Sequence, residues 1–119
     1  MLFLHYPKCT TCQATRKELD LCNISYEERD IRTDNPTYTE IKDWWERSGY
    51  PLKKFFNTSG MIYKEQNLKE KLPQMSEEEQ LQLLATDGML VKRPLMIDGN
   101  TISIGKKAIL DTYTKSHQS

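Results

Sequence analysis

The sequence predicts an α/β fold in which a βαβ unit and a ββα unit flank a stretch of helices. An apolar run at residues 1–6 leads directly into a segment with helical periodicity. Near the other end, Asp98-Gly99 lies between two short apolar runs, which is typical of a β-hairpin. Between these regions, turn residues and capping residues mark several helix starts. These features together predict strands at both ends of the chain and helices in the middle.

The first part of the chain predicts the βαβ unit. Residues 1–6 are apolar enough for a buried strand. Residues 24–31 predict a second strand, although their acidic side chains make this prediction weaker. Residues 10–22 predict a helix with Thr10 or Thr11 as its N-cap. The order strand, helix, strand favours a parallel pair. The helix carries apolar or small side chains at Cys12, Leu19 and Cys22.

Residues 36–88 predict a helical insertion. Its first long helix ends at Ser48-Gly49, because glycine commonly stops a helix. Ser76 is followed three positions later by Glu79, which is the pattern of a capping box, and Gly88 would end the helix that starts there. We expect helices or helical turns at residues 37–47, 51–56, 68–72 and 76–88.

The last part of the chain predicts the ββα unit. Residues 95–97 and 101–104 predict two strands, and residues 106–113 predict a closing helix. Residues 114–119 resemble a loose polar tail. A length of 119 residues suits a single domain. We therefore expect one domain over residues 1–119, with a core of residues 1–35 and 89–115 and the insertion at residues 36–88.

Composition argues against several classes of function. Seventeen basic and 17 acidic side chains cancel, so no overall charge would attract nucleic acid or an anionic membrane. No apolar run approaches the roughly 18 residues of a membrane span, and the first residues lack the pattern of a secretory signal. We expect a cytoplasmic monomer that binds neither nucleic acid nor membrane directly.

Cys9-Thr10-Thr11-Cys12 is the motif with the most chemical meaning. A C-x-x-C in a reducing compartment is catalytic, redox-sensing or metal-binding more often than a static disulfide. A structural zinc site needs four ligands, and here the third cysteine is Cys22 while the two histidines, His5 and His117, lie near opposite ends. The motif therefore favours a redox pair, with no metal.

The position of the motif assigns a role to each thiol. A thiol is nucleophilic as the thiolate, and a helix N-terminus or a neighbouring cation lowers its pKa. Cys9 would have both, since it lies at the predicted helix start beside Lys8. Cys12, one turn further on, could displace a group bound to Cys9 as a disulfide. We predict that Cys9 attacks and Cys12 resolves, whereas Cys22, on the apolar side at the end of the same helix, has a structural role as a small hydrophobic side chain.

Arg93-Pro94 comes directly before the third predicted strand. In a thioredoxin-like arrangement a proline at this place is commonly cis, which would bring the preceding main chain close to the nucleophilic thiol. Arg93 would then favour the Cys9 thiolate and could bind an oxyanion through two parallel hydrogen bonds. An arginine on a solvated loop is the alternative interpretation.

The combination of YPKCTTC, the segment LKKFFNTSG and KRPLMIDG resembles the arsenate reductase-like family, which includes ArsC and the redox regulator Spx. The resemblance covers nearly the whole chain and is greater to the uncharacterised reductase-like branch than to the regulators. It implies a thioredoxin fold with a mixed four-stranded sheet and a helical insertion. It also implies an oxidoreductase with a redox-active disulfide at Cys9 and Cys12, supported by Arg93, Lys8 and Pro94, and no organic cofactor.

The resemblance leaves three functions to compare. A thiol-disulfide oxidoreductase would be reduced by a thioredoxin, a glutaredoxin or a low-molecular-weight thiol. An Spx-like regulator would bind the C-terminal domain of the RNA polymerase α subunit through a surface that includes a glycine near Gly49. A true arsenate reductase would need further arginines, which are absent at Asn57 and near Ile104-Gly105. We expect poor neutralisation of a bound arsenate and therefore favour the first function.

Overall fold

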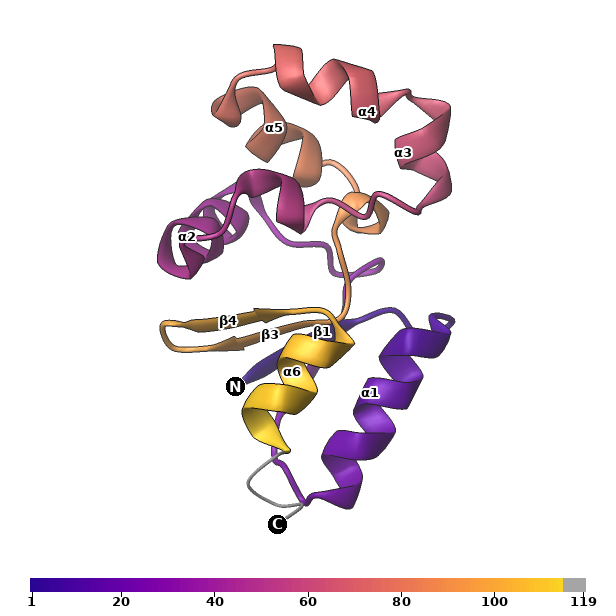
Figure 1. Cartoon of the computed structure of the whole chain (residues 1–119), viewed down its shortest axis with the longest axis vertical. Helices are drawn as coiled ribbons and strands as arrows, with labels where there is room; N and C mark the ends of the chain where they lie inside the picture. The colour runs from indigo at the N-terminus through magenta and orange to yellow at the C-terminus, as the bar shows by residue number, and fades with distance from the viewer. Residues whose placement is uncertain (115–119) are drawn as a thin grey trace. The chain divides into compact units, whose positions relative to one another are not determined.

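The computed structural model describes residues 1–114, so most of the predicted tail, including His117, lies outside the described residues. The chain forms two compact units (Figure 1). Among the described residues, the sheet unit comprises residues 1–30 and 93–114. The helical unit comprises residues 31–92. Each unit is described by itself below.

The sheet unit contains a mixed four-stranded sheet with strand order β2-β1-β3-β4. Strand β1 (Leu2–His5) pairs in parallel with β2 (Glu27–Asp30) and antiparallel with β3 (Leu95–Asp98), which pairs antiparallel with β4 (Thr101–Ile104). The predicted parallel pair and hairpin are both confirmed. Strand β2 is shorter than residues 24–31 because it is an edge strand, and Ile24 and Tyr26 instead pack against the core.

Two helices cover one face of this sheet. Helices α1 (Thr10–Leu21) and α6 (Lys106–Tyr113) lie side by side in Figure 1. Fully buried side chains from both helices and from β1 and β3 form the core between them, and each contributes about 1.5–3 kcal/mol to stability. The central residues of this core are Phe3, Leu19, Met96 and Ile109.

The hairpin between β3 and β4 has a two-residue loop. Asp98 pairs with Thr101, so the loop consists of Gly99 and Asn100. Gly99 has φ 58°, in the left-handed region that favours glycine. At the other end of the unit, Thr114 is buried and donates its hydroxyl hydrogen to the Leu110 carbonyl oxygen. Its prediction as part of a loose tail was wrong, because this residue ends α6 on the inside.

The helical unit is built from short helices with well-defined starts. The two longest are α2 (Tyr38–Ser48) and α5 (Glu77–Leu84), and both begin with a capping box, at Thr37 and Ser76. Gly49 ends α2 in the left-handed conformation with φ 72°. The remaining turns are η1 (Leu52–Phe55), α3 (Met61–Glu65), α4 (Leu68–Lys71), η2 (Leu72–Gln74) and η3 (Gly88–Leu90).

Gly88 has a different role from the predicted one. Helix α5 ends at Leu84 with Ala85 as its C-cap, and Gly88 begins η3. A Cβ atom at Gly88 would lie 1.7 Å from the Ile31 carbonyl oxygen. The glycine is therefore required by close main-chain packing and not by the end of a helix.

Main-chain hydrogen bonds close the helical unit near its end. Phe56 and Val91 form an antiparallel bridge. The Asn57 N–H donates to the Leu90 carbonyl oxygen at 2.8 Å, and the Lys92 N–H donates to the Phe55 carbonyl oxygen, also at 2.8 Å. Phe55 and Phe56 are both buried.

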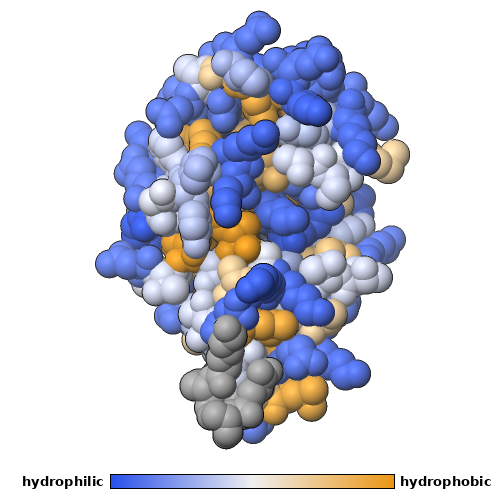
Figure 2. Space-filling model, viewed as in Figure 1, coloured by the Kyte–Doolittle hydropathy of each residue, from blue (hydrophilic) through white to orange (hydrophobic). Residues whose placement is uncertain are grey.

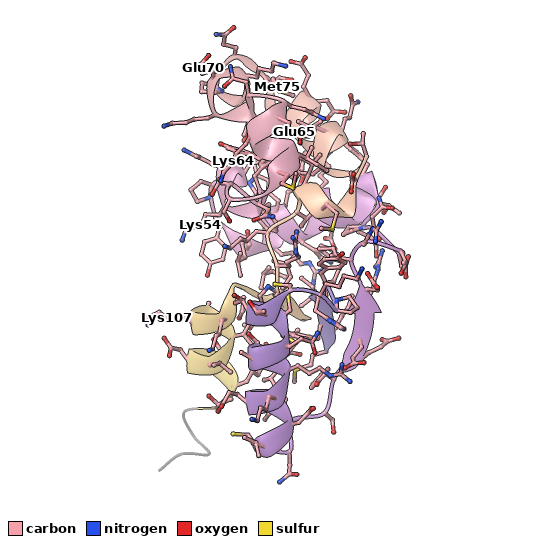
Figure 3. All side chains as sticks on the ribbon, turned by 90° about the vertical axis from the view of Figure 1, so that its right-hand side faces the viewer. Lys54, Lys64, Glu65, Glu70, Met75 and Lys107 are labelled. Carbon is pink, nitrogen blue, oxygen red and sulfur yellow. The ribbon has the colours of Figure 1, made fainter. Side chains whose placement is uncertain are left out.

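Charged side chains are frequent on the described surface. On the face shown in Figure 2, hydrophilic residues predominate and apolar residues show in patches between them. In the helical unit, Figure 3 marks Lys54, Lys64, Glu65 and Glu70, all of which are exposed. Within residues 1–114, no helix is both long enough and apolar enough to cross a membrane.

Candidate functional site: a thiol pair at a helix start

Cys9 is itself the N-cap of α1. Its main chain is extended, with φ −85° and ψ 116°, and its sulfur accepts a hydrogen bond from the Cys12 N–H at 3.4 Å. The prediction of Thr10 or Thr11 as the cap was therefore wrong, because both residues lie in the first turn of the helix. The nucleophile candidate itself satisfies one of the main-chain donors that a helix start leaves free.

Hydrogen bonds and charge favour the thiolate of Cys9. Partial burial alone would raise the pKa of this thiol. Hydrogen bonds from the side chain and main chain of Cys12, the charge of Arg93 and the main chain of Thr11 act in the opposite direction, and the net pKa lies below the ordinary value of 9.0. The first turn of α1 contains no acidic residue, so no fixed carboxylate competes for the helix N-terminus.

Cys12 has the opposite character. Its side chain is fully buried, and this burial is the main cause that raises the pKa of Cys12 to about 12. The neighbouring Cys9 raises it further, through a hydrogen bond and through charge. The Tyr6 main chain and Arg93 act in the other direction. At neutral pH, Cys12 is therefore a thiol that can donate a hydrogen bond to the Cys9 sulfur.

Arg93 and Pro94 belong to the same site. The Arg93-Pro94 peptide bond is cis, as predicted. Pro94 is buried, and its carbonyl oxygen accepts a hydrogen bond from the Gly105 N–H at 2.8 Å. Arg93 is half-buried, and its charge lowers the pKa of both Cys9 and Cys12. The structure thus brings three of the sequence-predicted residues, Cys9, Cys12 and Arg93, into one electrostatic group.

Tyr6 is a site residue that the sequence analysis missed. The Arg93 guanidinium carbon lies 5.4 Å from the centre of the Tyr6 ring, within the range of a cation–π interaction. The Tyr6 carbonyl oxygen accepts the Cys9 N–H at 2.9 Å. An aromatic residue at the end of an apolar run is ordinarily assigned to the strand and its core. Its position three residues before Cys9 was the signal that could have found it.

Lys8 and Cys22 lie outside this group. Lys8 is exposed, and its charge is not among the causes that shift the pKa of Cys9. Cys22 is half-buried and is the C-cap residue of α1, at the opposite end of the helix from Cys9. All three cysteines are free thiols.

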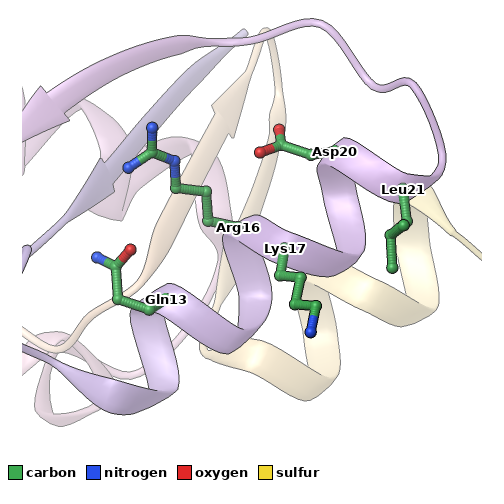
Figure 4. A pocket seen from close by; sticks show the side chains of 5 residues that line it. All are labelled: Gln13, Arg16, Lys17, Asp20 and Leu21. Carbon is green, nitrogen blue, oxygen red and sulfur yellow. The ribbon is translucent and has the colours of Figure 1, made fainter.

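A metal site and a surface depression were the other candidates. Among the described residues 1–114, no group of three or more His, Cys, Asp or Glu side chains is placed to hold a metal ion. A shallow depression of about 390 Å³ beside α1 is lined by Gln13, Arg16, Lys17, Asp20 and Leu21 (Figure 4). None of these is a cysteine. Arg16 is paired with Glu28 at 2.8 Å, and Asp20 accepts a hydrogen bond from Tyr26.

Comparison with known proteins shows the family to which the chain belongs. The model of the ArsC family matches residues 4–110, which is most of the chain. The chain belongs to the ArsC family. The uncharacterized protein YusI of Bacillus subtilis is 52% identical over 107 residues, covering 90% of this chain and 91% of YusI.

Two further relatives extend the comparison. The crystal structure of a putative ArsC family related protein from Bacteroides fragilis is 56% identical, covers 87% of each chain and superposes with a TM-score of 0.85. Regulatory protein MgsR of Bacillus subtilis is 29% identical, covering 88% of this chain and 82% of MgsR. The ArsC-like fold expected from the resemblance, with its mixed sheet and helical insertion, is confirmed.

Proposed function

We propose that this ArsC family protein is a thiol-disulfide oxidoreductase that uses Cys9 as the nucleophile and Cys12 as the resolving thiol. The observation that carries the proposal is the hydrogen bonding at the start of α1, where the Cys9 sulfur is the acceptor and Cys12 is the donor. The two pKa values consequently move apart. A pair of titratable groups with opposite shifts is typical of two different chemical roles.

The first step is attack on a substrate disulfide. The Cys9 thiolate bonds to one substrate sulfur, the substrate S–S bond breaks, and the second substrate sulfur leaves as a thiolate that takes a proton from solvent. The product is a mixed disulfide on Cys9. Arg93 favours the thiolate form that starts this step.

The second step uses Cys12. Bonding of Cys9 to the substrate removes the charge and the hydrogen bond that helped to raise the pKa of Cys12. The Tyr6 main chain and Arg93 still favour the Cys12 thiolate. Cys12 loses its proton and attacks the Cys9 sulfur, which releases the second substrate thiol and forms the Cys9–Cys12 disulfide. The substrate has then gained two electrons from the two cysteines and two protons, one from solvent and one from Cys12.

An external reductant closes the cycle. A thioredoxin, a glutaredoxin or a low-molecular-weight thiol would reduce the Cys9–Cys12 disulfide by the same exchange chemistry. No step requires a metal or an organic cofactor. The proposal suits a reducing compartment such as the cytoplasm, where a disulfide of this kind is transient.

Turnover of a model disulfide tests the proposal. The full chain is assayed with bis(2-hydroxyethyl) disulfide and a thioredoxin–thioredoxin reductase–NADPH system, and the same assay is repeated with glutathione. Cys9→Ser should abolish turnover and Cys12→Ser should reduce it strongly. Cys22→Ser is the matched control, since Cys22 lies at the far end of the same helix, and it should retain full turnover. Equal turnover in Cys9→Ser and the unmodified chain would refute the assignment.

A redox-sensing regulator is the second candidate, favoured by the likeness to regulatory protein MgsR. Such a protein would use the same thiol pair as a switch and bind the C-terminal domain of the RNA polymerase α subunit. Gly49, at the end of α2, is exposed, as a contact of this kind requires. The isolated C-terminal domain of the α subunit, immobilised on a resin, should capture the reduced or the oxidised chain. Absence of capture in both states would remove this candidate.

Arsenate reduction has less support. Of the arginines that the resemblance implies for arsenate binding, the chain has Arg93 and lacks those expected at Asn57 and near Ile104. A doubly charged oxyanion would meet one guanidinium at these positions. We expect no arsenate-dependent oxidation of the reductant.

A further inference from the structure

Tyr6 contacts three parts of the thiol site through three different groups. Its ring lies against the Arg93 guanidinium, with 5.4 Å from the guanidinium carbon to the ring centre. Its carbonyl oxygen accepts the Cys9 N–H at 2.9 Å. Its main chain also forms a hydrogen bond that favours the Cys12 thiolate. Tyr6 thus interacts directly with the Cys9 main chain, with the Cys12 thiol and with the Arg93 guanidinium.

The main-chain contact fixes where α1 begins. The hydrogen bond from the Cys9 N–H to the Tyr6 carbonyl closes a four-residue turn through Pro7 and Lys8. Proline is well suited to the second position of such a turn, because its ring fixes φ near the value required there. Tyr6 ends the strand side of this turn and Cys9 ends the helix side. The position of the tyrosine ring is therefore tied to that of the Cys9 sulfur by a short, closed piece of chain.

The ring contact restricts Arg93. An arginine side chain has many rotamers, and its effect on a thiolate depends on how close the guanidinium remains. A planar guanidinium over an aromatic face loses much of that freedom. The Arg93 charge acts on Cys9 and on Cys12. By limiting the movement of the guanidinium, the Tyr6 ring would therefore keep the Arg93 charge close to both thiols and maintain its lowering of their pKa values.

We propose that Tyr6 is the positioning residue of the thiol site, holding the Arg93 guanidinium through its ring and the start of α1 through its carbonyl group. The ring acts on Cys9 through Arg93 and does not touch the substrate. This inference deepens the proposed function, but it concerns the reactivity of Cys9 and not turnover. The alkylation rate of Cys9 can therefore refute this inference without refuting the proposed function, and disulfide turnover can do the reverse.

A double-mutant cycle tests the role of the ring. The rate of iodoacetamide alkylation of Cys9 is measured by mass spectrometry across pH in a Cys22→Ser background. Tyr6→Leu should slow alkylation about three-fold at a pH below the Cys9 midpoint, and Tyr6→Phe, which keeps the ring, should match the unmodified residue. In an Arg93→Met background, Tyr6→Leu should change the rate by less than about 1.5-fold.

Two results would overturn the proposal. The first is an equal effect of Tyr6→Leu with and without Arg93, because the ring would then act by another route. The second is a rate for Tyr6→Leu that equals that of Tyr6→Phe. If Tyr6→Leu fails to fold, NMR of the unmodified chain tests the contact between Tyr6 and Arg93 instead. A guanidinium stacked on the Tyr6 ring requires ring-current shifts of the Arg93 side-chain protons. Ordinary shifts for these protons would equally refute the proposal. If the unmodified chain shows no disulfide turnover but the double-mutant cycle gives the expected alkylation rates, the proposed function is refuted and this inference remains.

Discussion

The Cys12 main-chain N–H donates a hydrogen bond to the Cys9 sulfur at 3.4 Å, so the second cysteine of the motif stabilises the first. The same geometry makes Cys9 the N-cap of α1. A thiolate at this position accepts hydrogen bonds that a helix start must otherwise give to water or to another cap. Helix formation and thiol activation therefore use the same atoms.

Alkylation across pH should separate the two thiols of the motif. In a Cys22→Ser variant, Cys9 should react with iodoacetamide with a midpoint below 9.0, because the hydrogen bonds from Cys12 and the charge of Arg93 outweigh its partial burial. Cys12 should stay unreactive until much higher pH, since burial raises its pKa to about 12. Peptide mass spectrometry assigns the modified residue. Faster modification of Cys12 than of Cys9 at neutral pH would contradict the geometry.

His5 should make the sheet unit sensitive to acid. Its side chain is 5% exposed and stacks on Phe3, and burial lowers its pKa from 6.5 in spite of the opposing charges of Glu28 and Asp30, with Arg16 lowering it further. Because the folded state binds this proton less readily than the unfolded state, the contribution to stability is complete above pH 6.5 and is lost as pH falls through the lowered pKa.

Urea unfolding followed by circular dichroism between about pH 5 and pH 7.5 measures this effect. His5→Leu should lose less stability on acidification than the unmodified chain does. An identical pH slope for the two proteins would show that His5 does not carry the effect.

Gly88→Ala should severely destabilise the helical unit. The new Cβ would lie 1.7 Å from the Ile31 carbonyl oxygen, which is main chain and cannot rotate away. We expect a loss of about 3 kcal/mol or more. Both tryptophans, Trp44 and Trp45, lie in this unit, so fluorescence during denaturation reports on it. Gly49→Ala is the control, because a Cβ atom at Gly49 would meet no atom within 4 Å outside the adjoining main chain, and only the positive φ costs about 1 kcal/mol. Equal losses for both variants would argue against the close packing.

Ser76→Ala should weaken the start of α5. The Ser76 hydroxyl oxygen accepts the Glu79 N–H at 3.1 Å, and the Glu79 carboxylate accepts the Ser76 N–H at 3.0 Å. Loss of the hydroxyl should lower the free energy of unfolding by about 1 kcal/mol. Gln82→Ala, an exposed change on the same helix, should alter it by less than about 0.5 kcal/mol. A cost for Ser76→Ala no larger than that of the control would mean that the cap contributes little.

The sequence predicted the elements whose signals are local. The capping box at Ser76, the hairpin around Gly99 and the burial of the β1 run depend on residues close together in the chain, and all three are present. The boundaries of β2 were less predictable, because an edge strand with acidic residues has no strong apolar pattern. Gly88 was misassigned because its neighbour, Ile31, is distant in sequence.

In the candidate site, too, local features could be predicted from the sequence, whereas contacts between distant residues could not. The positions of Cys9 and Cys12 at a helix start could be predicted from the apolar run before them and the helical periodicity after them, and the cis bond before Pro94 from the place of this proline in a thioredoxin-like arrangement. The capping role of the Cys9 sulfur could not, because threonine is the more common cap. The contact between Tyr6 and Arg93 could not be predicted either, since it joins residues far apart in sequence.

Trapping of the mixed disulfide shows directly whether Cys9 is the attacking thiol. A Cys12→Ser, Cys22→Ser chain is incubated with bis(2-hydroxyethyl) disulfide at neutral pH, and intact and peptide masses are measured. We expect one adduct, on Cys9, whereas a chain that retains Cys12 should go on to form the Cys9–Cys12 disulfide. The absence of an adduct on Cys9, or equally fast modification of Cys12 in a Cys9→Ser chain, would contradict this expectation.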